Sequence, residues 1–287
     1  MTLATNRTSL SVLMAVYSRE KPAFLAQCLE SIAAQTLPAD QVVVVKDGPL
    51  TPELEAVLAE FAARLPLETP ALKENRGTGA AVQMGMECCT GDLIARADSD
   101  DVYAPTRFEK QVEFLRAHLE VDIVSASGAE FETDPARPVC FRQAPLSGRS
   151  LARYARFRNP ITYQSTVIYR RAPALKAGSY QSCAYFEDYD LWARMMLNGS
   201  LIFNMPEILA YIRCGNGMLN RRRGFAYVRH EMAFLNKMYR IGFLSPGQYC
   251  LNVVSRVPLR LLPAGMLGSV YRTFLRKPIH AANSNLL

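Results

Sequence analysis

Short apolar runs and amphipathic segments alternate over the first hundred residues of the chain. Leu10–Val16, Val42–Val45 and Leu93–Ala97 are short runs bounded by polar segments, and we expect them to be buried strands. Apolar residues at helical spacing follow the first two runs, with Pro22 and Thr51 at the expected helix starts. This order predicts parallel strands joined by crossover helices. The fold class is therefore α/β, with a mostly parallel, twisted sheet flanked by helices.

The pattern becomes less regular in the second half of the chain. A further helix is expected before the third strand, over Thr78–Cys89. After residue 101 we expect a helix containing Phe108, strands over Val121–Ser125 and Ser165–Tyr169, a polar excursion over Phe131–Ser150, a helix around Leu191, and a helical segment from Tyr211 to the end. These elements predict one domain over residues 1–218, with a regular part over about 1–101 and a less regular part over about 102–218.

The charge separates this domain from the rest of the chain. Residues 219–287 contain 11 Lys and Arg residues and one acidic residue, a net charge of +10, whereas residues 1–218 carry −3 of the total of +7. Basic charge confined to one segment argues against a protein that binds nucleic acid with its whole surface. We expect this segment to be a basic, amphipathic helical tail.

Three carboxylates follow the third expected strand, in the sequence Arg96-Ala97-Asp98-Ser99-Asp100-Asp101. Carboxylates at the carboxyl end of a parallel strand lie in the ligand crevice of an open α/β sheet. They repel one another unless a cation is present, and Mg²⁺ or Mn²⁺ binds one or two carboxylates together with phosphate oxygens. A solvated acidic turn before a helix at Pro105 explains the same residues. The motif alone leaves both interpretations open.

Two further segments suit a nucleotide. Asp47 follows the valine strand, where an acidic residue can accept hydrogen bonds from a base or ribose, although Asp-Gly is also a common turn. Glu74–Gly79 opens a helix and resembles a glycine-rich phosphate loop, but Val82 stands where the third small residue of the dinucleotide motif belongs. Arg76, beside the start of this helix, can still hold a diphosphate.

A second acidic segment, Phe186-Glu187-Asp188-Tyr189-Asp190-Leu191-Trp192, lies at an expected helix start. The helix dipole stabilises carboxylates there, which is a purely structural explanation. Aromatic neighbours favour a second explanation, because apolar surroundings raise the pKa of a carboxylate toward that of a working general base. Aromatic faces also suit sugar rings.

In this order and spacing, the motifs resemble those of inverting glycosyltransferases of family 2, which have the GT-A fold. The resemblance is greatest to the branch that builds exopolysaccharide and O-antigen repeat units, and it covers nearly the whole chain. The matching segments are Ser11–Tyr17, Val45–Gly48, Glu74–Gly77, Ala95–Asp101 and Glu187–Trp192. The resemblance implies transfer of a hexose from a nucleotide-diphospho sugar, usually a UDP-sugar, to a lipid-linked saccharide, with Mn²⁺ or Mg²⁺ as cofactor.

The resemblance implies that residues 1–218 are the catalytic domain, with a nucleotide-binding half over about 1–101 and an acceptor half over about 102–218. It also assigns roles to single residues. The nucleotide-binding positions are Ala15, Val16, Tyr17, Asp47, Arg76 and Asp98. Asp100 matches the metal ligand, alone or together with Asp98, and Asp188 matches the general base, with Glu187 and Asp190 as its neighbours. Ala15 and Ser18 replace the commoner Pro and Asn of the opening motif, a departure that bears on base-binding geometry. The candidates for acceptor contact are Trp192, Arg221, Arg222 and Arg223.

The tail interleaves basic and apolar residues from about Leu251 onward. Such a segment can lie in the headgroup layer of an anionic membrane, or it can pack on the domain with a solvated basic face. The sequence has no apolar run long enough to span a bilayer and no evident signal peptide. The expected location is therefore cytoplasmic, peripheral on the inner face of the cell membrane.

Two other functional classes share parts of this pattern. A nucleotidyltransferase also uses metal-bound carboxylates and nucleotide phosphates, but it releases pyrophosphate where a glycosyltransferase releases a nucleoside diphosphate. A non-catalytic, membrane-associated module that binds sugar nucleotides is the other alternative. The presence of every carboxylate in both acidic motifs argues against such a module.

Overall fold

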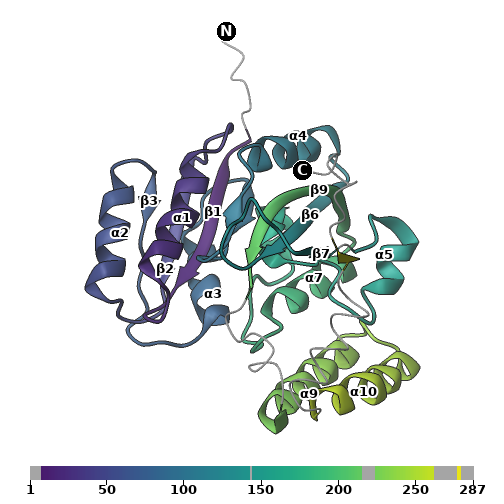
Figure 1. Cartoon of the computed structure of the whole chain (residues 1–287). Helices are drawn as coiled ribbons and strands as arrows, with labels where there is room; N and C mark the ends of the chain where they lie inside the picture. Colours follow the sequence, from purple (N-terminus) through teal and green to yellow (C-terminus); the bar gives the residue numbers. More distant parts are fainter. Residues whose placement is uncertain (1–7, 143, 215–223, 262–276, 279–287) are drawn as a thin grey trace.

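The computed structural model describes residues 8–142, 144–214, 224–261 and 277–278. Its first part follows the predicted alternation: β1 (Leu10–Val16), α1 (Pro22–Ala33), β2 (Gln41–Lys46), α2 (Pro52–Ala62), β3 (Leu67–Glu68), α3 (Thr78–Cys88) and β4 (Leu93–Arg96) (Figure 1). These strands run parallel in the order β3-β2-β1-β4. Pro occupies the first turn of α1 and α2, and the side chain of Thr51 caps α2 by accepting a hydrogen bond from the N–H of Leu54.

The second part adds shorter elements and a long strand. They are β5 (Val102–Tyr103), α4 (Arg107–Ala117), β6 (Val121–Phe131), β7 (Cys140–Arg142), α5 (Gly148–Tyr154), a 3₁₀ turn (Gln164–Thr166), β8 (Ile168–Arg170), α6 (Arg171–Lys176), α7 (Glu187–Leu197) and β9 (Leu201–Arg213). Strand β8 lies antiparallel between β4 and β6, and β9 pairs parallel with β6 and antiparallel with β5. The strands of the described residues form one mixed, ten-stranded sheet. The predicted α/β class is confirmed.

Several sequence-based expectations need correction here. Strand β6 continues to Phe131, and the expected strand at Ser165 begins only at Ile168, after the 3₁₀ turn. The chain is not helical from Tyr211 onward, because β9 extends to Arg213 and residues 277–278 form a short strand, β10. Strand β10 pairs with β7 at the edge of the sheet.

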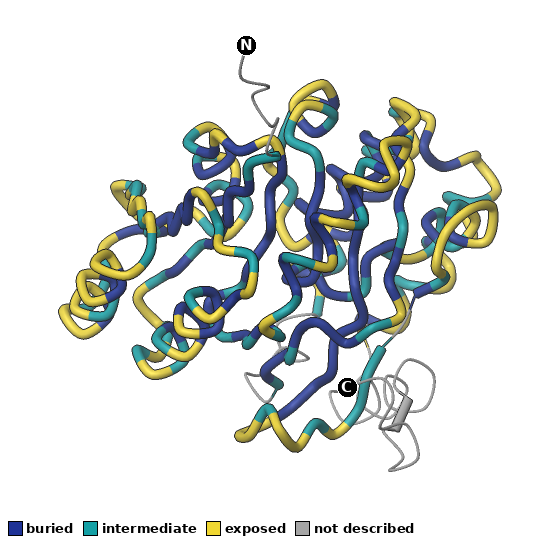
Figure 2. The backbone as a smooth tube through the Cα atoms, turned by 90° about the horizontal axis from the view of Figure 1, so that it is seen from above, coloured by how far each residue is buried: buried dark blue, intermediate teal, exposed yellow. Residues whose placement is uncertain are grey.

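The core lies on both faces of the sheet. Side chains alternate along each strand, so Val12 and Met14 pack with α1, α2 and α4, whereas Leu13 packs on the opposite face with α3 and α7. Burial on both faces explains why β2 contains four consecutive valines (Figure 2). Helix α3 approaches the sheet closely because Gly85 lacks a side chain; a Cβ there would lie 2.7 Å from Cγ2 of Val45.

Most of the described part of the tail forms a pair of helices, α9 (Gly224–Arg240) and α10 (Pro246–Leu261), which lie side by side next to α7 (Figure 1). Phe186 stacks on Phe234 of α9, with ring centroids 4.6 Å apart. The predicted domain boundary at residues 218–219 lies outside the described residues. None of the helices described has the length and apolar character needed to cross a bilayer.

Candidate active site

The carboxyl ends of β1, β2 and β4 bring the predicted nucleotide-binding segments together. Val16 is in register with Lys46 of β2, and Leu13 is in register with Arg96 of β4. Because these strands are parallel, the residues that follow them emerge at one edge of the sheet. Tyr17, Asp47 and the acidic segment from Asp98 to Asp101 therefore share that edge.

Asp47 connects the end of β2 to the loop before α3. Its carboxylate accepts a hydrogen bond from the backbone N–H of Arg76 at 2.7 Å and another from that of Gly77 at 3.0 Å. A Cβ at Gly48, which has a φ of 84°, would lie 2.7 Å from the backbone nitrogen of Asn75, so only glycine allows this approach. Base reading by Asp47 stays a prediction, while its visible contacts fix the loop that carries the exposed Arg76.

The acidic segment after β4 divides into a structural carboxylate and two candidate ligands. Asp101 is buried and accepts hydrogen bonds from Oγ of Ser165 at 2.6 Å and from the backbone N–H of Arg213 at 3.0 Å. The side chain of Asp98 is 32% exposed, and its carboxylate accepts a hydrogen bond from Nε2 of Gln164 at 3.3 Å. Burial, followed by the charges of Asp98 and Glu20, raises the pKa of Asp100 to about 7.

A divalent cation suits this part of the site. Among the described residues there is no ready group of three or more possible metal ligands. Mg²⁺ and Mn²⁺ do not require one, because they bind through one or two carboxylates and complete their coordination with substrate phosphates and water. Burial and the charges of Asp98 and Glu20 raise the pKa of Asp100, so a bound cation would stabilise its ionised form. The chemistry of Asp98 and Asp100 therefore fits the predicted metal.

The first turn of α7 faces the same site from the other half of the chain. Asp188 is 3% exposed, and burial raises its pKa to about 6. Burial and the neighbouring Asp188 raise the pKa of Glu187 to about 7. The side chain of Glu187 also lies 3.6 Å from the position that a Cβ on Gly79 would occupy, so the starts of α3 and α7 are adjacent.

A buried arginine connects the two acidic motifs. Arg96, the last residue of β4, is 1% exposed. Its Nη2 lies 3.6 Å from Oδ1 of Asp98, and its Nε lies 3.9 Å from Oδ1 of Asp188. The neighbouring Tyr180 hydroxyl opposes the rise in the pKa of the Asp188 carboxyl. The predicted base and the first aspartate of the metal motif are therefore parts of one cluster.

Two other residues predicted for the site, Asp190 and Trp192, have side chains that contact other parts of the protein. Asp190 is fully buried and forms ion pairs with Arg194 and Lys237, so its carboxylate connects α7 to α9. Trp192 is fully buried and packs edge-on against Tyr169 at 5.2 Å, so its burial does not support the predicted contact with the acceptor. Of the aromatic residues around Asp188, Phe186, Tyr189 and Trp192 are buried, and Tyr185 is 54% exposed. Residues 221–223, the predicted basic acceptor cluster, lie outside the described residues.

Sequence reasoning missed several members of the site: Arg96, Gln164, Ser165, Tyr180 and Arg213. Arg96 carried the clearest signal, because a charged residue ending a buried apolar strand needs a partner. The others come from segments whose proximity depends on β8 and β9, and nothing in their local sequence marks them.

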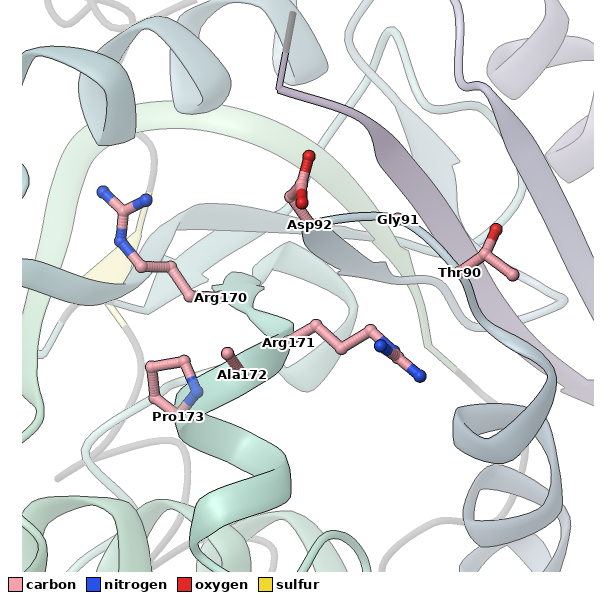
Figure 3. Close-up of a pocket in the computed structure, with 7 residues that line it drawn as sticks. All are labelled: Thr90, Gly91, Asp92, Arg170, Arg171, Ala172 and Pro173. Atoms are coloured by element: carbon pink, nitrogen blue, oxygen red, sulfur yellow. The ribbon is translucent and has the colours of Figure 1, made fainter. Parts of the chain in front are cut away.

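The described residues also line a pocket of about 250 Å³ at the opposite edge of β4 (Figure 3). Thr90–Asp92 precede β4, Arg170 is the last residue of its antiparallel neighbour β8, and residues 171–173 follow β8. The guanidinium of Arg170 donates to the backbone carbonyls of Val121 and Leu115, which commits it to the fold. This pocket is separate from the carboxylate cluster.

The fold and the meeting of the two acidic motifs indicate a glycosyltransferase, and comparison with known proteins agrees. Residues 11–177 match the model of the family described as Glycosyl transferase family 2. The chain is 38% identical over 268 residues to "Amylovoran biosynthesis glycosyltransferase AmsE" of Erwinia amylovora, covering 91% of this chain and 97% of that protein. The chain belongs to glycosyltransferase family 2.

Two further comparisons extend this result. The chain is 32% identical over 267 residues to the Escherichia coli "UDP-Gal:alpha-D-GlcNAc-diphosphoundecaprenol beta-1,3-galactosyltransferase", covering 93% of this chain and 96% of that protein. A mannosyltransferase from Pyrobaculum calidifontis, solved with GDP-Man and Mn²⁺, superposes with a TM-score of 0.64 at 17% identity and covers 94% of this chain and 82% of that one. The predicted GT-A fold and enzyme class are confirmed.

Proposed function

We propose that this enzyme transfers a hexose from a nucleotide-diphospho sugar, a UDP-sugar in the first instance, to a saccharide carried on a lipid diphosphate. The observation that carries the proposal is the meeting of two acidic motifs, with Asp188 and Asp98 on either side of Arg96. Relatives named for amylovoran biosynthesis and for transfer from UDP-Gal to a diphosphoundecaprenol-linked sugar support the substrate classes.

Asp188 is the proposed general base. Its carboxylate takes the proton from the acceptor hydroxyl as that oxygen attacks the anomeric carbon from the side opposite the leaving diphosphate. A single displacement of this kind inverts the anomeric configuration and needs no covalent intermediate. The pKa of about 6 keeps Asp188 ionised at neutral pH while leaving it a stronger base than an exposed aspartate.

The donor lies along the opposite side of the cluster in this proposal. Tyr17 and the end of β1 contact the base, and Arg76 and the start of α3 face the diphosphate. Asp100, with Asp98, would hold Mn²⁺ or Mg²⁺, which when bound offsets the charge of the leaving diphosphate. Asp98 supports this role because its side chain is 32% exposed, whereas Asp101 is buried and hydrogen-bonded to Ser165 and Arg213.

The proposed acceptor is a lipid, so we also propose a peripheral position on the cytoplasmic face of the membrane. Leu251, Val254 and Leu261 of α10 are 55%, 70% and 47% exposed, and their spacing places them along one side of the helix. Arg256 and Arg260 instead lie against the buried Glu231, at 2.6 Å and 2.7 Å. The described part of the tail thus supports an apolar contact more than the basic one expected from the sequence.

The test is a turnover assay with purified protein and a lipid-diphosphate-linked saccharide. A panel of UDP-, GDP- and dTDP-sugars should reveal a donor that gives nucleoside diphosphate and an extended saccharide, with loss of activity in EDTA and recovery with Mn²⁺. Asp188→Asn should lower turnover by at least about 100-fold while donor affinity stays within a few-fold. The matched variant Glu187→Gln should retain more turnover. Release of pyrophosphate, or normal turnover in Asp188→Asn, would reject the proposal.

A further inference from the structure

Arg96 occupies a rare position for a charged side chain. Its guanidinium is enclosed in the protein, and Nη1 donates to the backbone carbonyl of Leu13 at 2.6 Å and more weakly to that of Ala97 at 3.3 Å. These two bonds fix the guanidinium against the ends of β1 and β4. The remaining nitrogens, Nε and Nη2, face Asp188 and Asp98.

The guanidinium pairs fully with neither carboxylate. The separations of 3.6 Å to Asp98 and 3.9 Å to Asp188 exceed the usual hydrogen-bond length. Nε of Arg96 and Oδ1 of Asp188 are both buried without a hydrogen-bond partner, although they face each other. Buried charged groups normally satisfy their hydrogen bonds, so a small movement that closes this gap is favourable.

We infer that Arg96 is a positioning residue shared between the two acidic motifs, and that occupation of Asp98 by the cation and donor diphosphate commits its guanidinium to Asp188. This inference rests on the proposed function. A cation at Asp98 neutralises one of the two carboxylates that attract Arg96, so Asp188 then holds the guanidinium alone. Arg96 would thereby orient the carboxylate of the base only after the donor is in place.

Competition for Asp98 gives the inference a specific signature. In the free enzyme the positive charge of Arg96 repels a cation at Asp98. In the reacting enzyme the same charge orients the carboxylate of Asp188. Replacing Arg96 by a neutral side chain should therefore strengthen cation binding and slow the chemical step. Damage to the fold alone would weaken cation binding and also slow the chemical step.

The variants are Arg96→Met and Arg96→Lys, with Arg107→Met as the matched control. Arg107 is equally buried and donates to the backbone carbonyls of Arg96 and Val167, but the described residues show no ion pair for it. Thermal unfolding of each variant comes first. Mn²⁺ affinity is then measured by calorimetry with the metal alone, and kcat and KM are measured with donor and acceptor.

In Arg96→Met we expect Mn²⁺ to bind roughly fivefold more tightly, because the substitution removes a positive charge that lies 3.6 Å from Oδ1 of Asp98. We expect kcat to fall by about 100-fold with a smaller change in the KM of the donor. Arg96→Lys keeps the charge, so its Mn²⁺ affinity should stay near wild type and its kcat should exceed that of Arg96→Met. Arg107→Met should gain less Mn²⁺ affinity than Arg96→Met, because no carboxylate of the described residues lies within ion-pair distance of Arg107.

Weaker Mn²⁺ binding in Arg96→Met, or a kcat equal to that of wild type, would overturn the inference. If Arg96→Met does not fold, Arg96→Lys decides, and a kcat loss in that variant as large as in Asp188→Asn would overturn it. Asp188→Asn in the same assay separates the two proposals. An active Asp188→Asn enzyme rejects the proposed base, whereas an inactive one beside an unaffected Arg96→Met rejects only the role of Arg96.

Discussion

The carboxylate of Asp190 lies 2.6 Å from Nζ of Lys237, and this ion pair joins the helix of the proposed base to the first helix of the tail. Asp190 is completely buried and also pairs with Arg194 at 2.7 Å. The tail therefore stabilises α7, the element that presents Asp188, and is more than an attachment to the catalytic half.

Lys237→Met should lower the free energy of unfolding by about 1 to 3 kcal/mol, because it leaves a buried carboxylate with one cationic partner in place of two. Urea denaturation at neutral pH measures this change. Lys176→Met, at an exposed position on α6, should change stability by less than about 0.5 kcal/mol. Equal stability of the two variants would show that the ion pair does not hold the helices together.

The pH dependence of kcat/KM should report the ionisation of Asp188. Burial raises the pKa of this acid to about 6, so the base is protonated below that pH and activity should fall as pH decreases through about 6. Tyr180→Phe removes a hydroxyl that lowers the pKa of Asp188, so it should move the midpoint to higher pH. Tyr169 donates a hydrogen bond to Tyr180 and lies further from the carboxylate, so Tyr169→Phe should move the midpoint less. A midpoint unchanged by Tyr180→Phe would assign the titration to another group.

Asp100→Asn should stabilise the metal-free protein and abolish stabilisation by Mn²⁺. Burial and the charges of Asp98 and Glu20 raise the pKa of Asp100 to about 7, so its ionisation opposes folding, and this penalty grows as pH rises from about 4 to about 7. At pH 8 in EDTA the variant should be more stable by about 1 to 3 kcal/mol, and at pH 4 the two proteins should be similar. Thermal unfolding with EDTA or Mn²⁺ measures both effects. A wild-type midpoint insensitive to Mn²⁺ would argue against the metal site.

The exposed side of α10 should contribute to membrane binding. The double variant Leu251→Ser and Val254→Ser should reduce co-sedimentation with vesicles of phosphatidylglycerol and phosphatidylethanolamine several-fold, because it removes apolar area that would enter the lipid interface. Leu119→Ser, at a residue 76% exposed after α4, is the matched control. Unchanged binding of the double variant would leave α10 without a membrane role.

Truncation of the tail is a poorer test of the same idea. Removing residues from Ser255 onward would take away Arg256 and Arg260, the two cations that lie against the buried Glu231 of α9. A buried carboxylate without its partners destabilises the helix that carries it. Loss of membrane binding by such a truncation would then reflect damage to α9.

The local parts of the fold could be predicted from the sequence because local signals determine them. β1 has the predicted limits, α1 begins at Pro22, and α2 begins directly after its N-cap Thr51, since an apolar run and a helix-start signature act over a few residues. β9 could not be found in this way. It contains Asn204, Pro206 and Glu207, which interrupt a strand pattern, and the shifts in its register with β6 accommodate this interruption.

The motifs of the site could be predicted from the sequence, but most contacts between their side chains could not. Asp188 and Trp192 are one helical turn apart and lie on the same side of α7, so sequence places them together. Only packing shows that Trp192, a turn deeper, is covered by the sheet while Asp188 remains at its edge. The approach of Arg96 to Asp188 depends on how two halves of the chain fold against each other, and no local pattern contains that information.

The bond between Asp101 and the backbone of Arg213 spans 112 residues. During synthesis, the strands and helices of the first hundred residues leave the ribosome long before Arg213 does. The loop that carries Asp98 and Asp100 therefore lacks one of its fixed points until β9 has emerged and paired with β5 and β6. A nascent chain that ends before β9 has the nucleotide-binding strands but not a finished metal loop, so donor binding should appear late in biosynthesis, nearly together with the complete sheet.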